Sequence, residues 1–392
     1  MNALALSHRA PSRALLIIGI LLIATTLRAP ITGVAPLLGM IRPYFDLGTT
    51  AAGALTALPL LAFAVVSPFG ALLAREYGLE RSLFFALMLV TAGIVLRSRD
   101  AAWCLYTGTW IIGMGIAIGN VLLPSLIKRD FPEKVTSITG LYALAMGMAA
   151  ALASAVAIPL EHFWGWRHSL GTIVALPLAA LAVWVMQVGA HTKPARDTAA
   201  PPHGGKVWSS ALAWQVTLFL GLNSAIYYVA IAWLPTILQD AGLSAAHAGS
   251  LHGLLQLATA IPALLHGPNL ARMKDQRAAA ITVSSISAAA LAGLLVAPEW
   301  APLWTVAFGI GSGAAIILGL AFISLRTRNA HQAAALSGMS QCIGYLLAAI
   351  GPLAMGAIHD QLHGWAVPLG VTVALALAAA AIGALAGRRR QI

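Results

Sequence analysis

Long apolar segments alternate with short polar ones along the whole sequence. Most apolar segments carry few or no charges and are long enough to cross the hydrocarbon core of a bilayer, which takes about 20 helical residues. The segment at 82–96 is short and depends on its flanks. The first segment is not expected to be a removable signal peptide, because eleven more follow it. We predict twelve membrane-spanning helices, at residues 14–38, 51–74, 82–96, 102–127, 136–160, 168–186, 211–238, 246–266, 278–298, 301–325, 331–358 and 365–387.

A polar stretch at 191–210, rich in Pro and Gly, separates the first six predicted spans from the last six. The sequence on its two sides is weakly self-similar at an offset of about 197 residues. Four matches keep the same order: 47–53 with 243–249, 70–75 with 267–272, 113–115 with 309–311, and 165–166 with 364–365.

The repeat predicts an all-α membrane protein of two pseudo-symmetric six-helix bundles. The N-terminal bundle covers 1–190, the cytoplasmic linker 191–210 and the C-terminal bundle 211–392. Two such halves form a transporter architecture, with the substrate site between them near the membrane midplane.

Composition supports this prediction, because 59% hydrophobic and only 9% charged residues exclude an ordinary soluble enzyme, a disordered chain or a fibrous one. The net charge of +11 would suggest nucleic acid in a soluble protein. Twelve spans place both termini on one side, and if that side is cytoplasmic, 18 Lys and Arg lie inside against four outside. The positive charge therefore indicates orientation, with both termini cytoplasmic, and no nucleic-acid partner is expected.

Several other functions lack the residues they need. Cys104 and Cys342 lie far apart, so neither a disulfide framework nor a metal site is indicated. The sequence has no phosphate-binding loop of an ATP-driven pump. An intramembrane enzyme would need a Ser/His or paired-Asp constellation at depth, for which His252 and scattered Ser are poor evidence. We expect no enzyme activity and no cofactor, and a monomer whose partners are the lipid bilayer and a small-molecule substrate.

The segment 70–81 (GALLAREYGLER), between the second and third predicted spans, resembles the signature loop Gly-x-x-x-Asp-Arg-x-Gly-x-Arg/Lys-Arg/Lys of the major facilitator superfamily. The resemblance implies a major facilitator fold and a cytoplasmic gate loop. The positions that carry it are Gly70, Arg75, Gly78 and Arg81. Ala74 replaces the usual acidic residue, so we expect the polar contacts of this loop to be weaker or built differently.

Four further strings are similar to the bacterial cyanate and 2-nitroimidazole transporter family: 26–30 (TLRAP), 119–132 (GNVLLPSLIKRDFP), 250–259 (SLHGLLQLAT) and 331–338 (HQAAALSG). The likeness covers about residues 14–388 and is greatest to the 2-nitroimidazole branch. It implies a secondary transporter of the bacterial inner membrane that moves a small polar or anionic nitrogen-containing solute by alternating access. Another organic anion, multidrug-type efflux, a transporter-like sensor and either direction of transport stay open.

Arg28 is the only charged residue that we place inside a predicted span. An arginine at that depth is costly unless it is paired or hydrated. Two roles are open: the guanidinium binds an anion, nitro group or carboxylate in an aqueous cavity, or it caps carbonyls freed by Pro30. The repeat aligns Arg28 with Tyr227 in the seventh span. We therefore predict that both flank one ligand, with Asn223 one turn away on the same face and Tyr228 pointing elsewhere.

Polar residues at helical spacing give the other candidates. His252, Gln256 and Thr259 form one stripe on the eighth span, where His252 is either a proton-coupling site or a neutral hydrogen-bonding partner. No Asp or Glu lies within a predicted span, so conventional carboxylate-based proton coupling is not expected, although a proton stays a candidate co-transported ion. The remaining candidate substrate contacts are Asn120, Gln341 and Tyr345, with Tyr142 and Trp233 as apolar walls.

Overall fold

The computed structural model describes residues 13–187, 205–265, 275–328 and 330–392, and within them the chain forms helices and no strand. The α-helices are α1 (Arg13–Thr26), α2 (Ala29–Thr32), α3 (Leu38–Tyr44), α4 (Thr49–Tyr77), α5 (Leu79–Arg97), α6 (Ala102–Asp130), α7 (Val135–Thr172), α8 (Ala175–Trp184), α9 (Ala211–Asp240), α10 (Ala245–Leu265), α11 (Arg277–Val296), α12 (Ala301–Leu325), α13 (Ala330–Leu362) and α14 (Ala366–Ala386). Of the predicted linker, residues 191–204 lie outside the described part, as does the repeat segment 267–272.

Ten segments of the described chain are long and apolar enough to cross a membrane. Two of the twelve predicted spans fall within one of these segments, 137–187, where the chain turns at Gly165 with a φ of 79°. The predicted eighth span forms α10 but is not among the ten, since two His, a Gln and a Ser lower its mean hydropathy. The chain is therefore an all-α, multi-pass membrane protein whose helices follow the predicted apolar runs.

The first predicted span is broken rather than continuous. Helix α1 ends at Thr26, the short α2 begins at Ala29, and the 3-10 helix η1 (Ala35–Leu37) precedes α3. Pro30 and Pro36 stand in the first turn of α2 and η1, where the missing N–H of proline costs no helical hydrogen bond. The breaks place Arg28 at the N-cap of α2, in the interior of the molecule.

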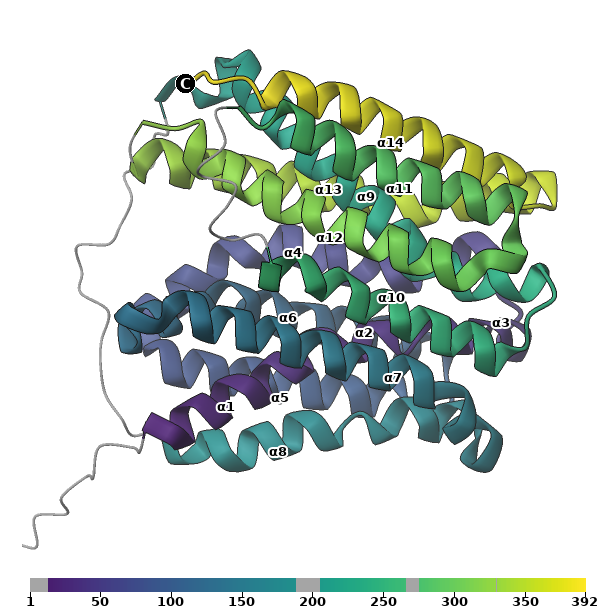
Figure 1. Cartoon of the computed structure of the whole chain (residues 1–392). Coiled ribbons are helices and arrows are strands. Elements are labelled where there is room, and N and C mark those ends of the chain that lie inside the picture. Colours follow the sequence, from purple (N-terminus) through teal and green to yellow (C-terminus); the bar gives the residue numbers. More distant parts are fainter. Residues whose placement is uncertain (1–12, 188–204, 266–274, 329) are drawn as a thin grey trace, which may run out of the picture.

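The helices form two bundles, α1–α8 and α9–α14, stacked as two layers in Figure 1. The start of α1 and the end of α14 lie at the same end, which we call the terminal end, and the opposite end is the far end (Figure 1). Hydrogen bonds join the two bundles in the far half. At the far end the Asp360 carboxylate accepts hydrogen bonds from the backbone N–H groups of Thr49 (3.1 Å) and Thr50 (2.9 Å).

Glycines allow α4 and α13 to cross closely between the bundles. A Cβ added to Gly53 would lie 3.0 Å from the carbonyl oxygen of Pro352, and one added to Gly356 would lie 3.0 Å from that of Thr49. The indole of Trp233 fills the space beside both glycines and donates a 2.9 Å hydrogen bond to the Pro352 carbonyl. This crossing brings the backbones of α4 and α13 close together at the far end.

Candidate functional site

A small cavity of about 110 Å³ lies between the two bundles. Its walls come from the broken first span, α4, α6 and α7 on one side and from α9 on the other. The lining residues are Leu27, Arg28, Ile31, Thr32, Phe63, Asn120, Met146, Tyr227, Tyr228 and Ile231. Three predicted contacts, Arg28, Asn120 and Tyr227, therefore meet at one cavity.

The Arg28 side chain is half-buried at this cavity. Its guanidinium carbon lies 5.2 Å from the centre of the Tyr227 ring, within the range of a cation–π contact. Within the described chain, no hydrogen bond or ion pair occupies the guanidinium, and no carboxylate lines the cavity. The five N–H donors of this side chain are therefore available to an acceptor in the cavity.

A second arginine supports the break in the first span. Arg97 donates a 2.6 Å hydrogen bond from Nη1 to the carbonyl of Pro30, and it is 1% exposed. Arg97, one of the four basic residues that the orientation prediction counts on the outer side, is the last residue of α5, and its side chain is buried. Helix α5 continues one residue beyond the predicted apolar run, and its last turn directs Arg97 inward.

Tyr227 connects the cavity to α10. Its hydroxyl donates a 3.1 Å hydrogen bond to Oε1 of Gln256, so Gln256 contacts the side chain that faces Arg28 rather than the cavity itself. The expectation that Tyr228 points elsewhere is wrong, because Tyr228 lines the same cavity, edge-to-face with Tyr227 at 5.2 Å. Two adjacent aromatic side chains on α9 are long enough to reach it together.

Tyr345 and Tyr142 lie in the layer of side chains behind the cavity. The Tyr345 ring meets Phe63 edge-to-face at 5.4 Å, and Tyr142 is half-buried beside the core of the first bundle. The prediction did not include Phe63, Thr32, Met146 or Ile231. Helical spacing could have indicated Thr32, Met146 and Ile231, which stand four residues after Arg28, Tyr142 and Tyr227 respectively.

Four other candidates do not line this cavity. The Asn223 side chain donates a 2.8 Å hydrogen bond to the Phe219 carbonyl of its own helix. Trp233 lies at the crossing of α4 and α13, and Gln341 is half-buried on α13. His252 is fully buried between α7 and α10, where its Nδ1 lies 2.6 Å from the Ser154 hydroxyl.

The predicted gate loop, residues 70–81, comprises the end of α4, the turn at Gly78 and the start of α5. Gly78 has a φ of 88°, a conformation that favours glycine, and Gly70 lies buried in α4. Arg81 is exposed at the start of α5, while the side chain of Arg75 falls outside the described part of the chain. Ala74 is buried and brings no charge to the loop.

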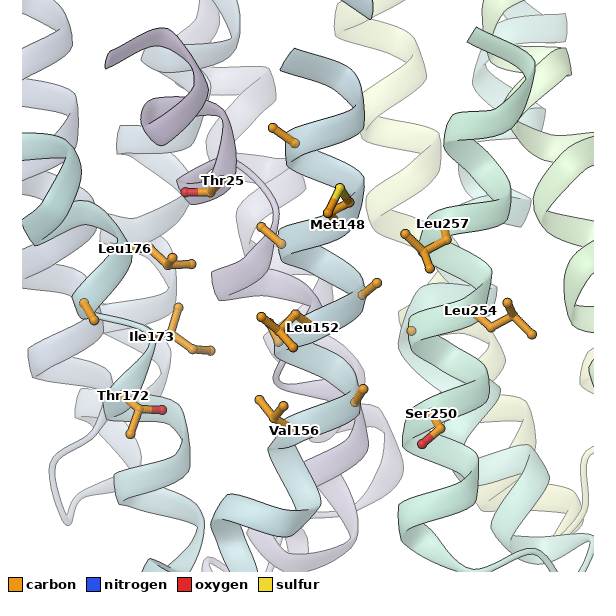
Figure 2. Close-up of a pocket in the computed structure, with 17 residues that line it drawn as sticks. Thr25, Met148, Leu152, Val156, Thr172, Ile173, Leu176, Ser250, Leu254 and Leu257 are labelled. Atoms are coloured by element: carbon orange, nitrogen blue, oxygen red, sulfur yellow. The ribbon is translucent and has the colours of Figure 1, made fainter. Parts of the chain in front are cut away.

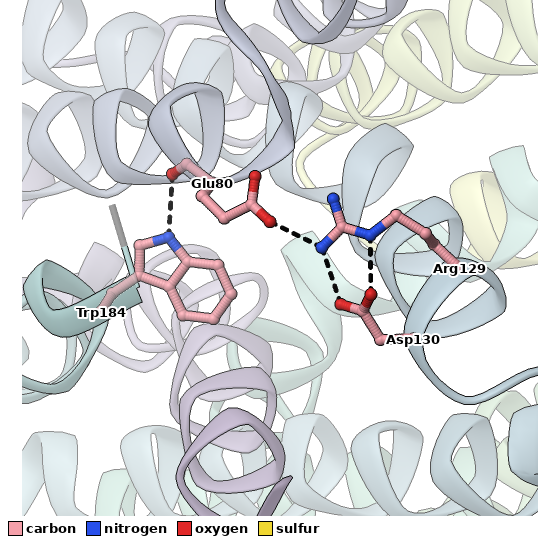
Figure 3. A network of polar contacts seen from close by, with 4 residues as sticks. All are labelled: Glu80, Arg129, Asp130 and Trp184. Atoms are coloured by element: carbon pink, nitrogen blue, oxygen red, sulfur yellow. Dashed lines mark hydrogen bonds and ion pairs between the residues drawn. The ribbon is translucent and has the colours of Figure 1, made fainter. Parts of the chain in front are cut away.

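The acidic partner expected of this loop comes from Glu80 instead. Its carboxylate accepts a 2.6 Å contact from Arg129 at the end of α6, and its backbone carbonyl accepts a 2.9 Å hydrogen bond from Trp184 (Figure 3). The second bundle repeats the pair with Gln276 and Arg326, which are hydrogen-bonded to each other. The acidic contact at this loop thus comes from Glu80 rather than from position 74, and a matching pair stands at the repeat-related positions of the second bundle.

Residues 14–349 match the Major Facilitator Superfamily. The chain belongs to this superfamily. It is 53% identical to the 2-nitroimidazole transporter of Escherichia coli (strain K12), over 97% of both chains. It is also 28% identical to the cyanate transport protein CynX of the same organism, over 87% of this chain and 89% of that one. It is therefore a membrane transporter of the cyanate and 2-nitroimidazole transporter family and not an enzyme.

Solved structures agree with this fold. A bacterial homolog of the human lysosomal transporter Spinster, in an inward-facing and unoccupied conformation, matches with a TM-score of 0.77 at 16% identity, over 97% of this chain and 98% of that chain. The likeness at this identity concerns the arrangement of the helices.

A larger hollow on this transporter does not have the chemistry of a polar-solute site. It measures about 900 Å³ and opens along the seam between α7, α8 and α10 (Figure 2). Most of its walls are Ala, Leu, Met, Val and Ile, with hydroxyls only from Thr25, Thr172 and Ser250 among the residues that line it. An apolar hollow at membrane depth is compatible with lipid chains, so the candidate site is the smaller cavity at Arg28.

Proposed function

We propose that this transporter moves a small planar nitrogen-containing or anionic solute, such as a 2-nitroimidazole or cyanate-like compound, with Arg28 as the central ligand-binding residue. The observation that carries the proposal is the unoccupied guanidinium of Arg28 in a cavity shared by both bundles, opposite the Tyr227 ring. A guanidinium offers parallel N–H donors to two oxygens of a nitro group or carboxylate. The name of the 53% identical relative supports the nitroimidazole class.

The size of the cavity favours a single small ring over a bulky drug. Drug-sized ligands occupy pockets of roughly 300–1,000 Å³. The Arg28 cavity has about 110 Å³, and Phe63, Tyr227 and Tyr228 supply flat aromatic walls. Multidrug-type efflux is therefore the less favoured alternative.

Alternating access would open the far end. The charge distribution predicts cytoplasmic termini, which makes the far end periplasmic and this conformation closed on the periplasmic side. Transport then requires the contacts of Asp360 with Thr49 and Thr50 to break while the two bundles rock about the Arg28 cavity. Helix α13 and helix α4 would separate at their glycine crossing.

In this proposal His252 is uncharged and forms a hydrogen bond without carrying a proton for transport. Its imidazole is fully buried beside Ser154, on the seam between bundles, and does not line the Arg28 cavity. A neutral imidazole costs less free energy in such a buried site than a charged one, which would need a buried partner. Substrate binding therefore does not depend on the protonation of His252.

The substrate class is tested by ligand-dependent thermal stabilisation of the purified transporter. The panel contains 2-nitroimidazole, imidazole, cyanate, benzoate and a bulky cationic dye, each over a concentration series. We expect saturable stabilisation by 2-nitroimidazole or by cyanate, and none by imidazole, which lacks the two nitro oxygens that would accept hydrogen bonds from Arg28. Stabilisation by the dye alone would refute the small-solute proposal and favour multidrug efflux.

A further inference from the structure

A second hollow lies at the terminal end, in the groove between the end of α4 and the start of α5. It has a volume of about 340 Å³ and is lined by Leu73, Tyr77, Arg81, Ser82 and Phe85. Tyr77 is 63% exposed and Phe85 49% exposed, so in a membrane protein this groove faces the lipid at the edge of the bilayer. It is separate from the Arg28 cavity and has no part in the proposed transport site.

The groove is polar at its mouth and apolar further along. Arg81 and Tyr77 stand at the ends of the two helices, while Phe85 and Leu73 lie one helical turn, about 5.4 Å, deeper toward the bilayer. Tyrosine at this level is typical of the membrane–water interface. The order of the side chains therefore follows that of a phospholipid, whose charged headgroup lies above its acyl chains.

Two polar groups in the groove have no protein partner within the described chain. The Ser82 hydroxyl belongs to a residue that is 3% exposed, lines the groove and has no hydrogen bond there. Arg81 forms no ion pair, since Glu80 beside it points into the protein and pairs with Arg129. A buried hydroxyl without a partner is costly, and a cation beside an apolar groove attracts an anion.

We propose that this groove binds an anionic phospholipid. The headgroup phosphate accepts hydrogen bonds from the Arg81 guanidinium, the Ser82 hydroxyl donates to an ester carbonyl below it, and an acyl chain lies between Leu73 and Phe85. Two acidic residues adjoin the mouth in sequence: Glu80, whose carboxylate pairs with Arg129, and Glu76, which is exposed. A bound lipid would stabilise the turn at Gly78 and the adjacent Glu80–Arg129 pair. The stability of this region would then depend on the lipid composition of the inner leaflet.

The test measures the apparent melting temperature of the full-length transporter in nanodiscs of phosphatidylcholine with and without phosphatidylglycerol. The variants are Arg81→Gln, Ser82→Ala and Phe85→Ala, and the matched control is Arg389→Gln, an exposed arginine at the same end. Inorganic phosphate added to phosphatidylcholine nanodiscs separates lipid binding from binding of the free anion.

We expect phosphatidylglycerol to raise the melting temperature of the unmodified protein and of Arg389→Gln equally. Arg81→Gln should lose at least half of that rise, Ser82→Ala and Phe85→Ala a smaller part, and phosphate should give none. Native mass spectrometry of the same proteins should show fewer retained phosphatidylglycerol molecules in the three groove variants. A full rise in all three variants, or an equal rise with phosphate alone, would overturn the proposal.

Discussion

The guanidinium of Arg97 holds the carbonyl of Pro30 at 2.6 Å, two residues from the arginine that faces the central cavity. Both arginines thus serve the break between α1 and α2. Arg97 fixes the backbone from within the first bundle, and Arg28 is left with its donors directed to the cavity. The division of roles between them explains how a transporter with so few charges keeps one cation available at membrane depth.

Replacing Arg97 by alanine should destabilise the protein and weaken substrate binding indirectly. The substitution leaves the Pro30 carbonyl without its donor and opens a void, and an unsatisfied buried group alone costs about 1–3 kcal/mol. Thermal unfolding in detergent measures the loss, with Arg99→Ala, an exposed neighbour, as control. Equal melting temperatures for the two variants would contradict the structural role of Arg97.

The ring and the hydroxyl of Tyr227 should contribute separately to ligand binding. Tyr227→Phe keeps the ring beside Arg28 and loses the hydrogen bond to Gln256, so we expect affinity to fall about fivefold, equivalent to about 1 kcal/mol. Tyr227→Leu also removes the cation–π contact, so ligand affinity should fall by about another 2- to 30-fold. Isothermal titration with the preferred ligand separates the two, and an inverted order would rule out the ring as a partner of Arg28.

A larger side chain at position 53 should hold α4 and α13 apart at the far end. A valine there would clash with the Pro352 carbonyl and the Trp233 ring, which lie 3.0 and 3.2 Å from the position of its Cβ. We expect Gly53→Val to reduce transport more than tenfold and to increase the distance between spin labels placed on α4 and α13 near the far end. Gly370→Val is the control, because an added Cβ there meets nothing within 4 Å. Normal transport by Gly53→Val would show that closure of this crossing is not required.

The substitution His252→Gln should leave substrate affinity within about twofold of the parent protein, since the imidazole contributes one hydrogen bond at the seam rather than a contact with the ligand. A glutamine amide can still meet the Ser154 hydroxyl. Uptake into proteoliposomes with and without an imposed pH gradient completes the test. Loss of the gradient's effect in this variant, with affinity retained, would restore the proton-coupling role that the sequence left open.

Much of the fold follows from the sequence because long apolar runs at membrane depth leave the backbone few alternatives to helix. The internal repeat placed Arg28 opposite Tyr227, and the two are in contact. Local pattern could not show that the side chain of Arg97 turns inward or that Trp233 fills a crossing between bundles, since both depend on neighbours distant in sequence. The same holds for Glu80, whose partner Arg129 is on another helix.

The role of Arg28 is tested most directly by binding and uptake of 2-nitroimidazole with purified Arg28→Ala and Arg28→Lys. Hydrogen bonds to a charged group contribute about 1.5–3 kcal/mol, so Arg28→Ala should lower affinity about 10- to 150-fold and abolish uptake into proteoliposomes. Arg28→Lys should retain partial binding, because it keeps the charge but loses the planar fork. Undiminished binding and uptake by Arg28→Ala, in protein that melts at the normal temperature, would contradict the account.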